Sequence, residues 1–358
     1  MQLLHTCLEK NVPFFSYRLP SAENYVVGIQ SVSDVEAVSC FDALNLDCKG
    51  FVVAPFLFGS GESAFFLKED FRVESDAVPE ELLVYLASLP KGKVEEETWP
   101  SAITHDVYRE RVEQLIESIR RGEAQKVVFS RNILSPLDES FDFGSVYGQL
   151  QKENPQAFVY CFYIPCQGLW MGATPELLLQ KRASSVSTVA LAGTMPQSSM
   201  TWSDKNREEQ AVVVRYIEQV MQSQGVSCLK MEGPDSVVAG SMCHLQTRFR
   251  GELPQEGDVL SLLAALHPTP AVCGYPKAEA MRLIALHEHV GRSFYSGFIG
   301  PVCDGDFSFF VNLRCMKINA NRAELFVGGG IMHDSEAEEE WQETMLKSKT
   351  MGRFVGLK

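Results

Sequence analysis

The chain has 358 residues, of which 45% are hydrophobic and 22% are charged, and its 32 Lys and Arg against 46 Asp and Glu give a formal net charge of −14. This composition is typical of a globular protein, and the length suits two ordinary domains or one large one. The acidic balance argues against nucleic acid and membrane surfaces as partners, because both require a concentrated basic face.

The cysteines and apolar stretches bear on the cellular compartment. The ten cysteines show no Cys-x-x-Cys spacing, so the sequence supports neither a zinc ribbon nor a thioredoxin-type motif. Glu9 and Lys10 interrupt the only early apolar stretch, which argues against a secretory signal there. The uncharged run between Glu153 and Glu176 contains prolines and Gly168, which a lipid-embedded helix rarely tolerates together. We therefore expect a soluble cytoplasmic protein whose cysteines are reduced and mostly buried.

The first hundred residues contain short apolar runs separated by turn residues, and these predict a β-rich start: FFSYRLP, NYVVGIQ, FVVAPFLFG and SAFFLKE. The charged, proline-terminated stretch Lys91–Pro100 is the best candidate for a linker. Apolar residues at helical spacing then predict an amphipathic helix from about His105 to Arg121. Helical periodicity returns at Asn206–Gln224, Lys277–Ser293 and Ser335–Met351.

Segments rich in β-branched and aromatic residues alternate with these helices and predict strands: QKVVFSRNI, AFVYCFYI, GLWMGA, SVSTVALAG, SFFVNLRCMKI and RAELFVGG. The strands come in runs that are often joined by short loops. We therefore predict antiparallel pairing and an α+β fold class.

Two residues are candidates for a base and an acid. Lys126 lies near the start of the segment QKVVFSR, and strand alternation puts it on one face with Val128 and Ser130. A lysine on an inner face is desolvated and has a lowered pKa, as a general base requires, although the local sequence alone favours a strand-edge lysine in solvent. Glu176 follows a Gly-x-x-Pro turn and precedes three leucines, where a carboxyl group in a dry pocket would act as an acid. The alternative is an ordinary glutamate at the start of a strand.

Acidic residues on two predicted helices are candidates for metal binding. Glu208 and Glu209 are predicted in the first turn of one helix, and Glu340, Glu343 and Lys347 share one face of another because they are spaced i, i+3 and i+7. Two carboxylates from two helices suit Mg²⁺, which takes few protein ligands. The alternative for Glu343 and Lys347 is a surface ion pair worth only about 0.3–0.5 kcal/mol.

A further group of residues is suited to binding anions: Arg314, the run Gly328-Gly329-Gly330, Gly193 and Thr194. Glycines let backbone N–H groups approach a carboxylate, and an arginine fork binds one bidentately. The glycine run is not a P-loop, because no Gly-Lys-Ser/Thr follows it. His244 and His267 could be ligands, but taken alone each is better explained as a structural histidine.

Taken together, ten segments in this order and at these intervals resemble the chorismate-utilising enzymes, and most closely the isochorismate synthases: KVVFSR, GATPELLL, ALAGT, NREEQAVV, CHLQTRFRG, LHPTPAVCGYPK, RSFYSGFIG, NLRCMK, FVGGGI and EWQETMLK. The resemblance extends from about Gln125 to the end of the chain. It implies a large antiparallel β-sandwich that encloses the active site, with helices outside. Residues 1–100 would be a variable β-rich part of the same domain, and residues 101–358 the chorismate-binding catalytic region.

The resemblance also implies roles for individual residues. Lys126 would be the base that activates water, and Glu176 the acid that protonates the departing hydroxyl group. Glu209 and Glu343 would hold Mg²⁺, with Glu340 as a partner outside the direct ligands and Glu208 ranked below Glu209. The residues that would contact chorismate are Gly193, Thr194, His244, Ala271, Tyr295, Leu313, Arg314, Gly328 and Lys347.

Within the family, the segment His267–Ala271 is similar to that of isochorismate synthases, which use water rather than ammonia. No glutaminase subunit is therefore expected, and the product would serve menaquinone or siderophore synthesis. Tyr295 is a mild departure, since phenylalanine is also common there in the family, and it leaves a residual salicylate-forming activity open. The alternatives are a salicylate synthase, which would continue by eliminating pyruvate, and a non-catalytic chorismate-binding protein.

Overall fold

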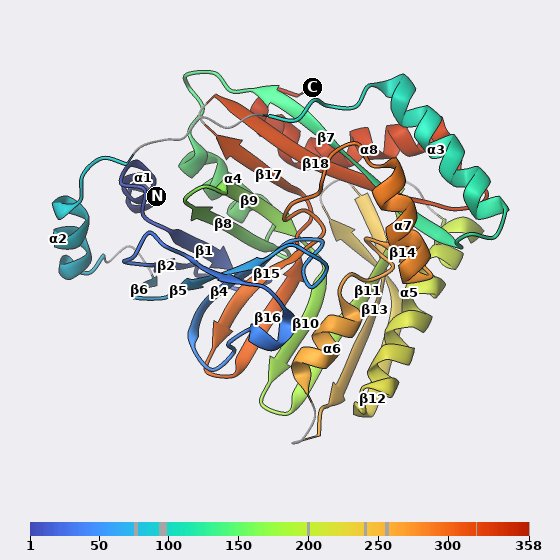
Figure 1. Ribbon diagram of the computed structural model, residues 1–358, viewed down its shortest axis with the longest axis horizontal. Coiled ribbons are helices and arrows are strands. Elements are labelled where there is room, and N and C mark those ends of the chain that lie inside the picture. Colours follow the sequence, from blue (N-terminus) through green and yellow to red (C-terminus); the bar gives the residue numbers. More distant parts are fainter. Residues whose placement is uncertain are drawn as a thin grey trace.

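The structure, a computed structural model, describes residues 1–74, 78–92, 99–198, 201–239, 242–254, 258–319 and 321–357. Its described part contains two antiparallel sheets that face each other as a sandwich (Figure 1). The first sheet runs in the order β14 (Gly274–Tyr275), β7 (Lys126–Pro136), β18 (Arg322–Ile331), β17 (Cys315–Asn319), β9 (Gly168–Thr174), β8 (Phe158–Ile164), β1 (Phe14–Arg18), β2 (Val26–Ile29) and β6 (Phe71–Glu74).

The second sheet is also antiparallel throughout. Its order is β12 (Ser227–Ala239), β13 (Met242–Glu252), β11 (Ser185–Pro196), β10 (Leu177–Arg182), β16 (Asp306–Val311), β15 (Phe298–Cys303), β4 (Lys49–Ala54), β5 (Ala64–Lys68) and β3 (Glu36–Val38). Strands from the first hundred residues thus continue both sheets at one end. The antiparallel α+β sandwich predicted from the sequence is confirmed, while the division at residue 100 stays a prediction.

Aromatic side chains fill the space between the sheets. Phe158 on β8 stacks on Phe310 on β16, with ring centroids 4.2 Å apart and planes 3° apart, so this pair joins the two sheets. Trp170 on β9 stacks on Phe326 on β18 at 5.3 Å. Each such pair adds about 0.5–1.5 kcal/mol to the free energy gained by burying its area. This interior fixes the separation of the sheets beside the pocket described below.

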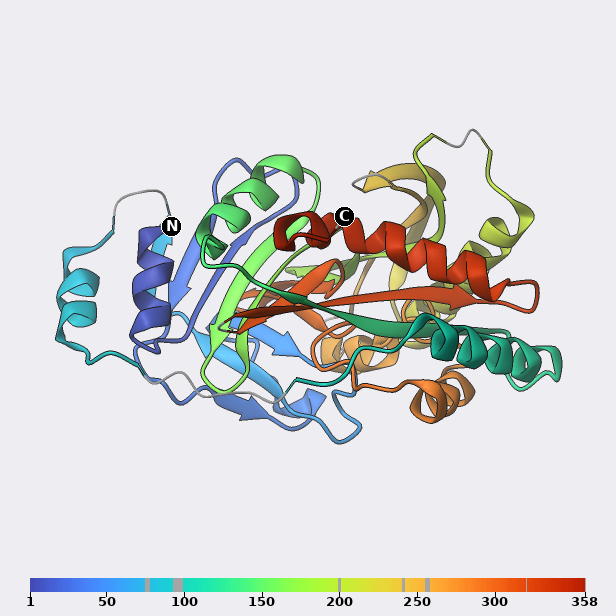
Figure 2. The same cartoon turned by 90° about the horizontal axis from the view of Figure 1, so that it is seen from above.

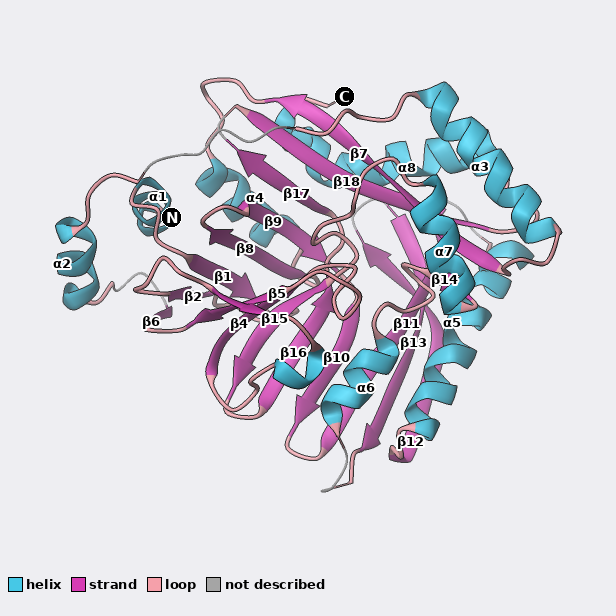
Figure 3. Cartoon of the chain, viewed as in Figure 1, coloured by secondary structure: helices cyan, strands magenta, loops and turns pink. Residues whose placement is uncertain are grey.

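Helices cover the outer faces of the sandwich, as Figures 2 and 3 show. They are α1 (Gln2–Glu9), α2 (Glu80–Ser88), α3 (His105–Arg120), α4 (Phe143–Glu153), α5 (Asp204–Ser223), α6 (Val259–Leu266), α7 (Lys277–His287) and α8 (Ala337–Gly352), with short 3₁₀ turns η1 (Phe41–Ala43) and η2 (Arg353–Val355). Helices α5 and α6 pack through Val213, Ile217 and Leu262 on the second sheet, whereas α1 and α4 pack through Leu4 and Tyr147 on the first.

The four predicted helices are present, with two corrections to their ends. Helix α5 begins at Asp204, because the side chain of Ser203 accepts a hydrogen bond from the N–H of Asn206 and caps it there. Glu208 and Glu209 therefore lie in the second turn, not the first. Helix α7 ends at His287 instead of Ser293, because Glu288 turns into an extended conformation (φ −71°, ψ 135°). Residues 93–98 of the proposed linker lie outside the described residues.

The cysteines are free thiols, as expected, but they are not mostly buried. Cys7, Cys161, Cys243, Cys273 and Cys315 are buried, Cys48 is half-buried, and Cys40, Cys166, Cys228 and Cys303 are exposed. The exposed ones lie at turns and strand ends, where no second layer covers them. No helix in the described ranges is both long and apolar enough to cross a bilayer.

Candidate active site

A pocket of about 680 Å³, open mouth included, lies where β7 and β18 meet β11, β13 and the start of β10. Eleven of the fourteen residues singled out from the sequence line it: Glu176, Gly193, Thr194, Glu209, His244, Ala271, Tyr295, Leu313, Arg314, Gly328 and Lys347. The other three, Lys126, Glu340 and Glu343, lie directly behind this lining, as the contacts below show. Segments more than two hundred residues apart in the sequence therefore build one site.

Lys126 is fully buried, with no exposed surface. Strand alternation directs it inward, because its neighbours Val127 and Phe129 pack on the opposite side among the apolar residues of α3 and α7. Its Nζ lies 2.9 Å from Oε1 of Glu209, an ion pair in which the side chain of Glu209 is 14% exposed. The solvent-exposed alternative for this lysine is therefore wrong.

Glu176 is also buried, only 3% exposed, immediately before β10. Burial raises the pKa of Glu176 to about 8, although the ammonium groups of Lys126 and Lys347 oppose the shift. The carboxyl group consequently holds its proton at neutral pH, which an acid catalyst requires.

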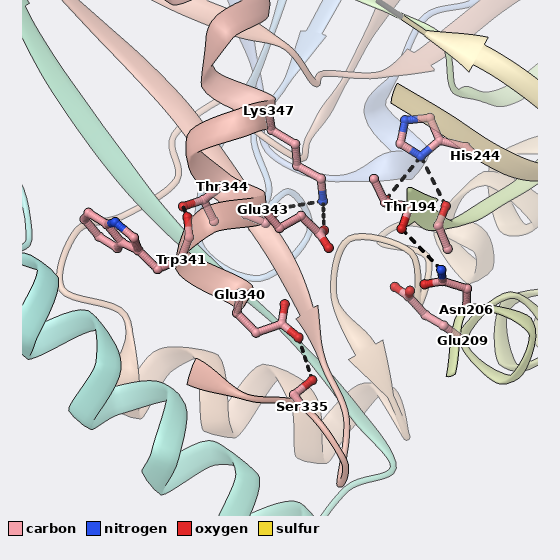
Figure 4. A network of polar contacts seen from close by, with 12 residues as sticks. Thr194, Asn206, Glu209, His244, Ser335, Glu340, Trp341, Glu343, Thr344 and Lys347 are labelled. Atoms are coloured by element: carbon pink, nitrogen blue, oxygen red, sulfur yellow. Dashed lines mark hydrogen bonds and ion pairs between the residues drawn. The ribbon is translucent and has the colours of Figure 1, made fainter. Parts of the chain in front are cut away.

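Three carboxylates surround the backbone at Gly329 and Gly330. Figure 4 shows Glu209 on one side of the site and Glu340 and Glu343 on the other, projecting from α8. A methyl group added to Gly329 would lie 3.0 Å from Oε2 of Glu340 and 3.9 Å from Oε1 of Glu343, and one added to Gly330 would collide with Oε1 of Glu209. Glycine at these two positions lets the strand run close to the acidic side chains.

Each of these carboxylates is paired with a lysine: Glu209 with Lys126 at 2.9 Å, Glu340 with Lys205 at 2.8 Å, and Glu343 with Lys347 at 2.6 Å. Burial raises the pKa of Glu209, but the charges of Lys126, Lys347 and Lys205 outweigh it and hold that pKa below its usual value. Burial and the nearby charge of Glu343 raise the pKa of Glu340. The site thus contains anionic oxygens whose charge is balanced by lysines.

The residues fit a hard divalent cation with few protein ligands. Within the described ranges, no three His, Cys, Asp or Glu side chains are already arranged to hold a metal ion. Oε2 of Glu340, however, is buried without a hydrogen-bond partner, and it faces the same glycine, Gly329, as Glu343. Mg²⁺ commonly takes one or two carboxylates and completes its shell with water and substrate oxygens. Glu209 from α5 and Glu343 from α8 match that number of carboxylates.

On the other wall, Arg314 and His244 form a hydrogen-bonded pair. Nη2 of Arg314 lies 3.0 Å from Nε2 of His244, and Nη1 donates to Oγ1 of Thr350 at 3.1 Å. Because arginine only donates, Nε2 must accept, which puts the imidazole proton on Nδ1, 3.3 Å from both the Gly193 carbonyl and Oγ1 of Thr194 (Figure 4). Burial and the charges of Arg314 and Lys347 hold the pKa of His244 well below its usual value, so the ring is neutral.

The remaining wall is formed around Gly328. Nζ of Lys347 donates to the Gly328 carbonyl at 2.9 Å, and a methyl group at Gly328 would lie 3.0 Å from Oη of Tyr295. Tyr295 stacks on Phe326 with centroids 5.6 Å apart and is thereby held flat against the pocket. Lys347 and Arg314 together give the pocket a positive end.

Some residues of the site were not singled out from the sequence. Phe326, Val128 and Leu191 line the pocket, and Lys205 pairs with the buried Glu340. Lys205 precedes Glu209 by four residues on α5, so helical spacing was a signal that could have identified it. The apolar lining carried no signal beyond ordinary strand composition.

Comparison with known proteins agrees with this site. A family model described as chorismate binding enzyme matches residues 80–356. The isochorismate synthase EntC of Escherichia coli is 32% identical over 250 residues, which are 66% of this chain and 63% of that enzyme. The isochorismate synthase MenF of Bacillus subtilis is 29% identical over 304 residues, which are 79% of this chain and 64% of that enzyme. The chain thus matches slightly less than two thirds of the length of either relative.

The solved structure of MenF, the menaquinone-specific isochorismate synthase from Escherichia coli, superposes with a TM-score of 0.81 at 21% identity, covering 99% of this chain and 91% of that one. At that level of identity the similarity concerns the fold alone. The family match, in contrast, covers more than three quarters of the sequence, including every segment that builds the pocket. The chain therefore belongs to the chorismate-binding enzyme family.

Proposed function

We propose that this protein is an isochorismate synthase, which converts chorismate to isochorismate for menaquinone or siderophore synthesis. The observation that carries the proposal is that a buried lysine and a protonated buried glutamate lie at the same pocket, which has a positive end, and that their charges interact. Lys126 comes from β7 in the first sheet, and Glu176 precedes β10 in the second. Such a pair suits a reaction in which water is deprotonated as a hydroxyl group leaves.

In the proposed mechanism, the ammonium group of Lys126 in its ion pair with Glu209 first gives up its proton, and the resulting amine takes a proton from the water whose oxygen attacks carbon 2 of the ring. The double bonds shift, and Glu176 delivers its proton to the hydroxyl group that leaves carbon 4 as water. One water enters and one departs, so the reaction is an isomerisation. An acid and a base placed in this way contribute roughly 10²–10⁴-fold each to the rate.

Binding of the dicarboxylate substrate requires local positive charge, because the protein as a whole is strongly anionic. Arg314 and Lys347 provide it, and Gly193, Ala271 and Gly328, which line the same pocket, would add backbone groups to the grip on the carboxylates. Glu209 and Glu343 would hold Mg²⁺, which when bound supplies positive charge for a substrate carboxylate. Tyr295 and Leu313 line the pocket and would form the wall beside the ring.

The direct test is to incubate the purified protein with chorismate and Mg²⁺ and to separate the products chromatographically. Isochorismate that persists in equilibrium with chorismate supports the proposal. Salicylate and pyruvate accumulating in equal amounts would identify a salicylate synthase instead. Chorismate binding without any turnover would identify a non-catalytic chorismate-binding protein.

We predict that activity requires Mg²⁺ and that Glu209→Gln or Glu343→Gln weakens Mg²⁺ binding and so removes the activation by Mg²⁺. Each change removes one negative ligand from a site with only two. Calorimetric titration of the protein with Mg²⁺ measures the loss independently of turnover. Glu208→Gln is the matched control, since this neighbouring glutamate is exposed and should bind Mg²⁺ like the wild type. Full activity of the wild type in excess chelator would contradict the prediction.

We predict that Arg314→Ala mainly weakens chorismate binding. Losing a charge-assisted, two-pronged contact costs on the order of 1.5–3 kcal/mol, which corresponds to roughly a 10- to 150-fold rise in KM. Steady-state kinetics over a range of chorismate concentrations give the value. Arg250→Ala on β13 is the control, because Arg250 is exposed and bonds only weakly to Ser185 at 3.4 Å. A large fall in kcat at unchanged KM would show that Arg314 does not bind the ground state.

A further inference from the structure

Behind the pocket, just past the end of α7, Glu288 and Arg292 form a buried ion pair. Their side chains are only 6% and 1% exposed. The contact is two-pronged, with Nε of Arg292 2.9 Å from Oε2 of Glu288 and Nη2 2.5 Å from Oε1. Neither residue lines the pocket, and the proposed mechanism gives neither of them a role.

The pair completes the open edge of the strand that carries Lys126. Strand β14 pairs with β7 only at Lys126 and Val127, and the last backbone bond between the segments runs from the N–H of Val128 to the carbonyl of Cys273. Beyond that point, side chains instead of a strand bond the backbone of β7. Nη2 of Arg292 donates to the Val128 carbonyl at 2.8 Å, and the N–H of Ser130 donates to Oε1 of Glu288 at 2.8 Å. The ion pair thus replaces a missing length of strand.

The same guanidinium also bonds the segment that runs beside β7 and lines the pocket with it. Nη1 of Arg292 donates to the Val272 carbonyl at 2.6 Å, and the group lies over the ring of Phe56 at 4.1 Å. Val128 and Val272 both line the pocket, and the Arg292 carbonyl accepts the N–H of Tyr295 at 2.9 Å. One planar cation therefore bridges the Lys126 strand, the segment after Ala271 and the tyrosine wall.

We propose that Glu288 and Arg292 are positioning residues that hold the strand of Lys126 in place against the neighbouring segment Ala271–Val272, where both line the pocket. This inference rests on the proposed function, because it assigns the pair a role in directing water to the ring held there. A fork of five donors is needed, since a lysine ammonium at this place could not bridge two carbonyl groups and a carboxylate in one plane.

The test is Arg292→Lys, which keeps the charge but not the fork. We expect kcat to fall at least tenfold while KM for chorismate changes less than threefold. We also expect a larger fraction of turnovers to release pyruvate, because a loosened pocket lets the ring and the enolpyruvyl group reach the geometry for elimination. This product ratio does not depend on how much of the protein is folded, so a purely structural role would not change it.

The matched control is Arg282→Lys on α7, whose partner Glu123 lies 2.7 Å away but whose side chain is 56% exposed. It should behave like the wild type. If Arg292→Lys folds poorly, Arg292→Ala answers the same question when it is assayed with and without free guanidinium. The added cation should restore part of kcat and lower the fraction of turnovers that release pyruvate. The inference would be overturned if Arg292→Lys kept the wild-type kcat and product ratio. It would also be overturned if kcat fell only in proportion to the folded fraction while the product ratio stayed unchanged. A wild-type protein that forms no isochorismate would instead refute the proposed function.

Discussion

Lys126→Met is expected to reduce chorismate turnover by about 10²–10⁴-fold, the range that one general base contributes. Methionine retains most of the length and packing of the fully buried lysine but cannot accept a proton. Chorismate binding should persist, because Arg314 and Lys347 remain. Steady-state turnover by chromatography, together with calorimetric binding of chorismate in the presence of Mg²⁺, separates the two effects.

The control for this variant is Lys181→Met on β10. Lys181 is another partly buried strand lysine, whose Nζ donates to the Gly305 carbonyl at 2.9 Å, but it does not line the pocket. It should retain wild-type turnover. Near-native activity of Lys126→Met would remove this lysine from the role of base. Parallel loss of turnover and chorismate binding would show that it holds the substrate instead.

Lys126 also illustrates what could be predicted from sequence. Alternation along QKVVFSR correctly placed it on one face with Val128 and Ser130, but the local sequence favoured solvent exposure. Burial arises from Glu209 on α5 and from the glycine strand β18, which are respectively more than eighty and two hundred residues further along the chain. Periodicity reports which side chains share a face, whereas the layer that covers the face is decided by the tertiary structure.

Helix ends and buried ion pairs could not be predicted from the sequence patterns for a related reason. A helix predicted through Ser293 makes Glu288 and Arg292 an ordinary i, i+4 surface pair, yet α7 ends at His287 and both side chains turn inward to the edge of β7. Likewise, no pattern near Lys205 in the sequence predicts its partner Glu340, which lies 135 residues away. In contrast, the amphipathic helix at His105–Arg120 was predicted almost to the residue, because one apolar face against the core determines it.

Glu176→Gln is expected to abolish most turnover and to change its dependence on pH. Only the protonated carboxyl can act as the acid, so wild-type kcat should decline as the pH rises through about 8, where burial places the pKa of Glu176. The glutamine variant has no proton to give, and its residual rate, lower by about 10²–10⁴-fold, should lack this decline. Glu62→Gln is the control, because burial also raises the pKa of Glu62, which lies outside the pocket. A wild-type profile that is flat between pH 7 and 9 would contradict the assignment.

The same substitution should make the protein more stable at alkaline pH. Glu176 binds its proton more tightly in the folded state, with a pKa of about 8 against 4.5 without burial, so between these values the folded protein holds more protons than the unfolded chain. The free energy of unfolding must then fall as the pH rises through that window, and the loss is complete above about 8, on the order of a few kcal/mol. Glutamine has the same shape and never ionises, so it removes this loss.

Thermal unfolding of both proteins at pH 5 and pH 8.5 should show similar melting temperatures at the lower pH and a higher melting temperature for Glu176→Gln at the upper pH. A variant that gains no stability between the two pH values would mean that the carboxyl of Glu176 is already ionised in the folded enzyme, and therefore cannot be the group that protonates the departing hydroxyl.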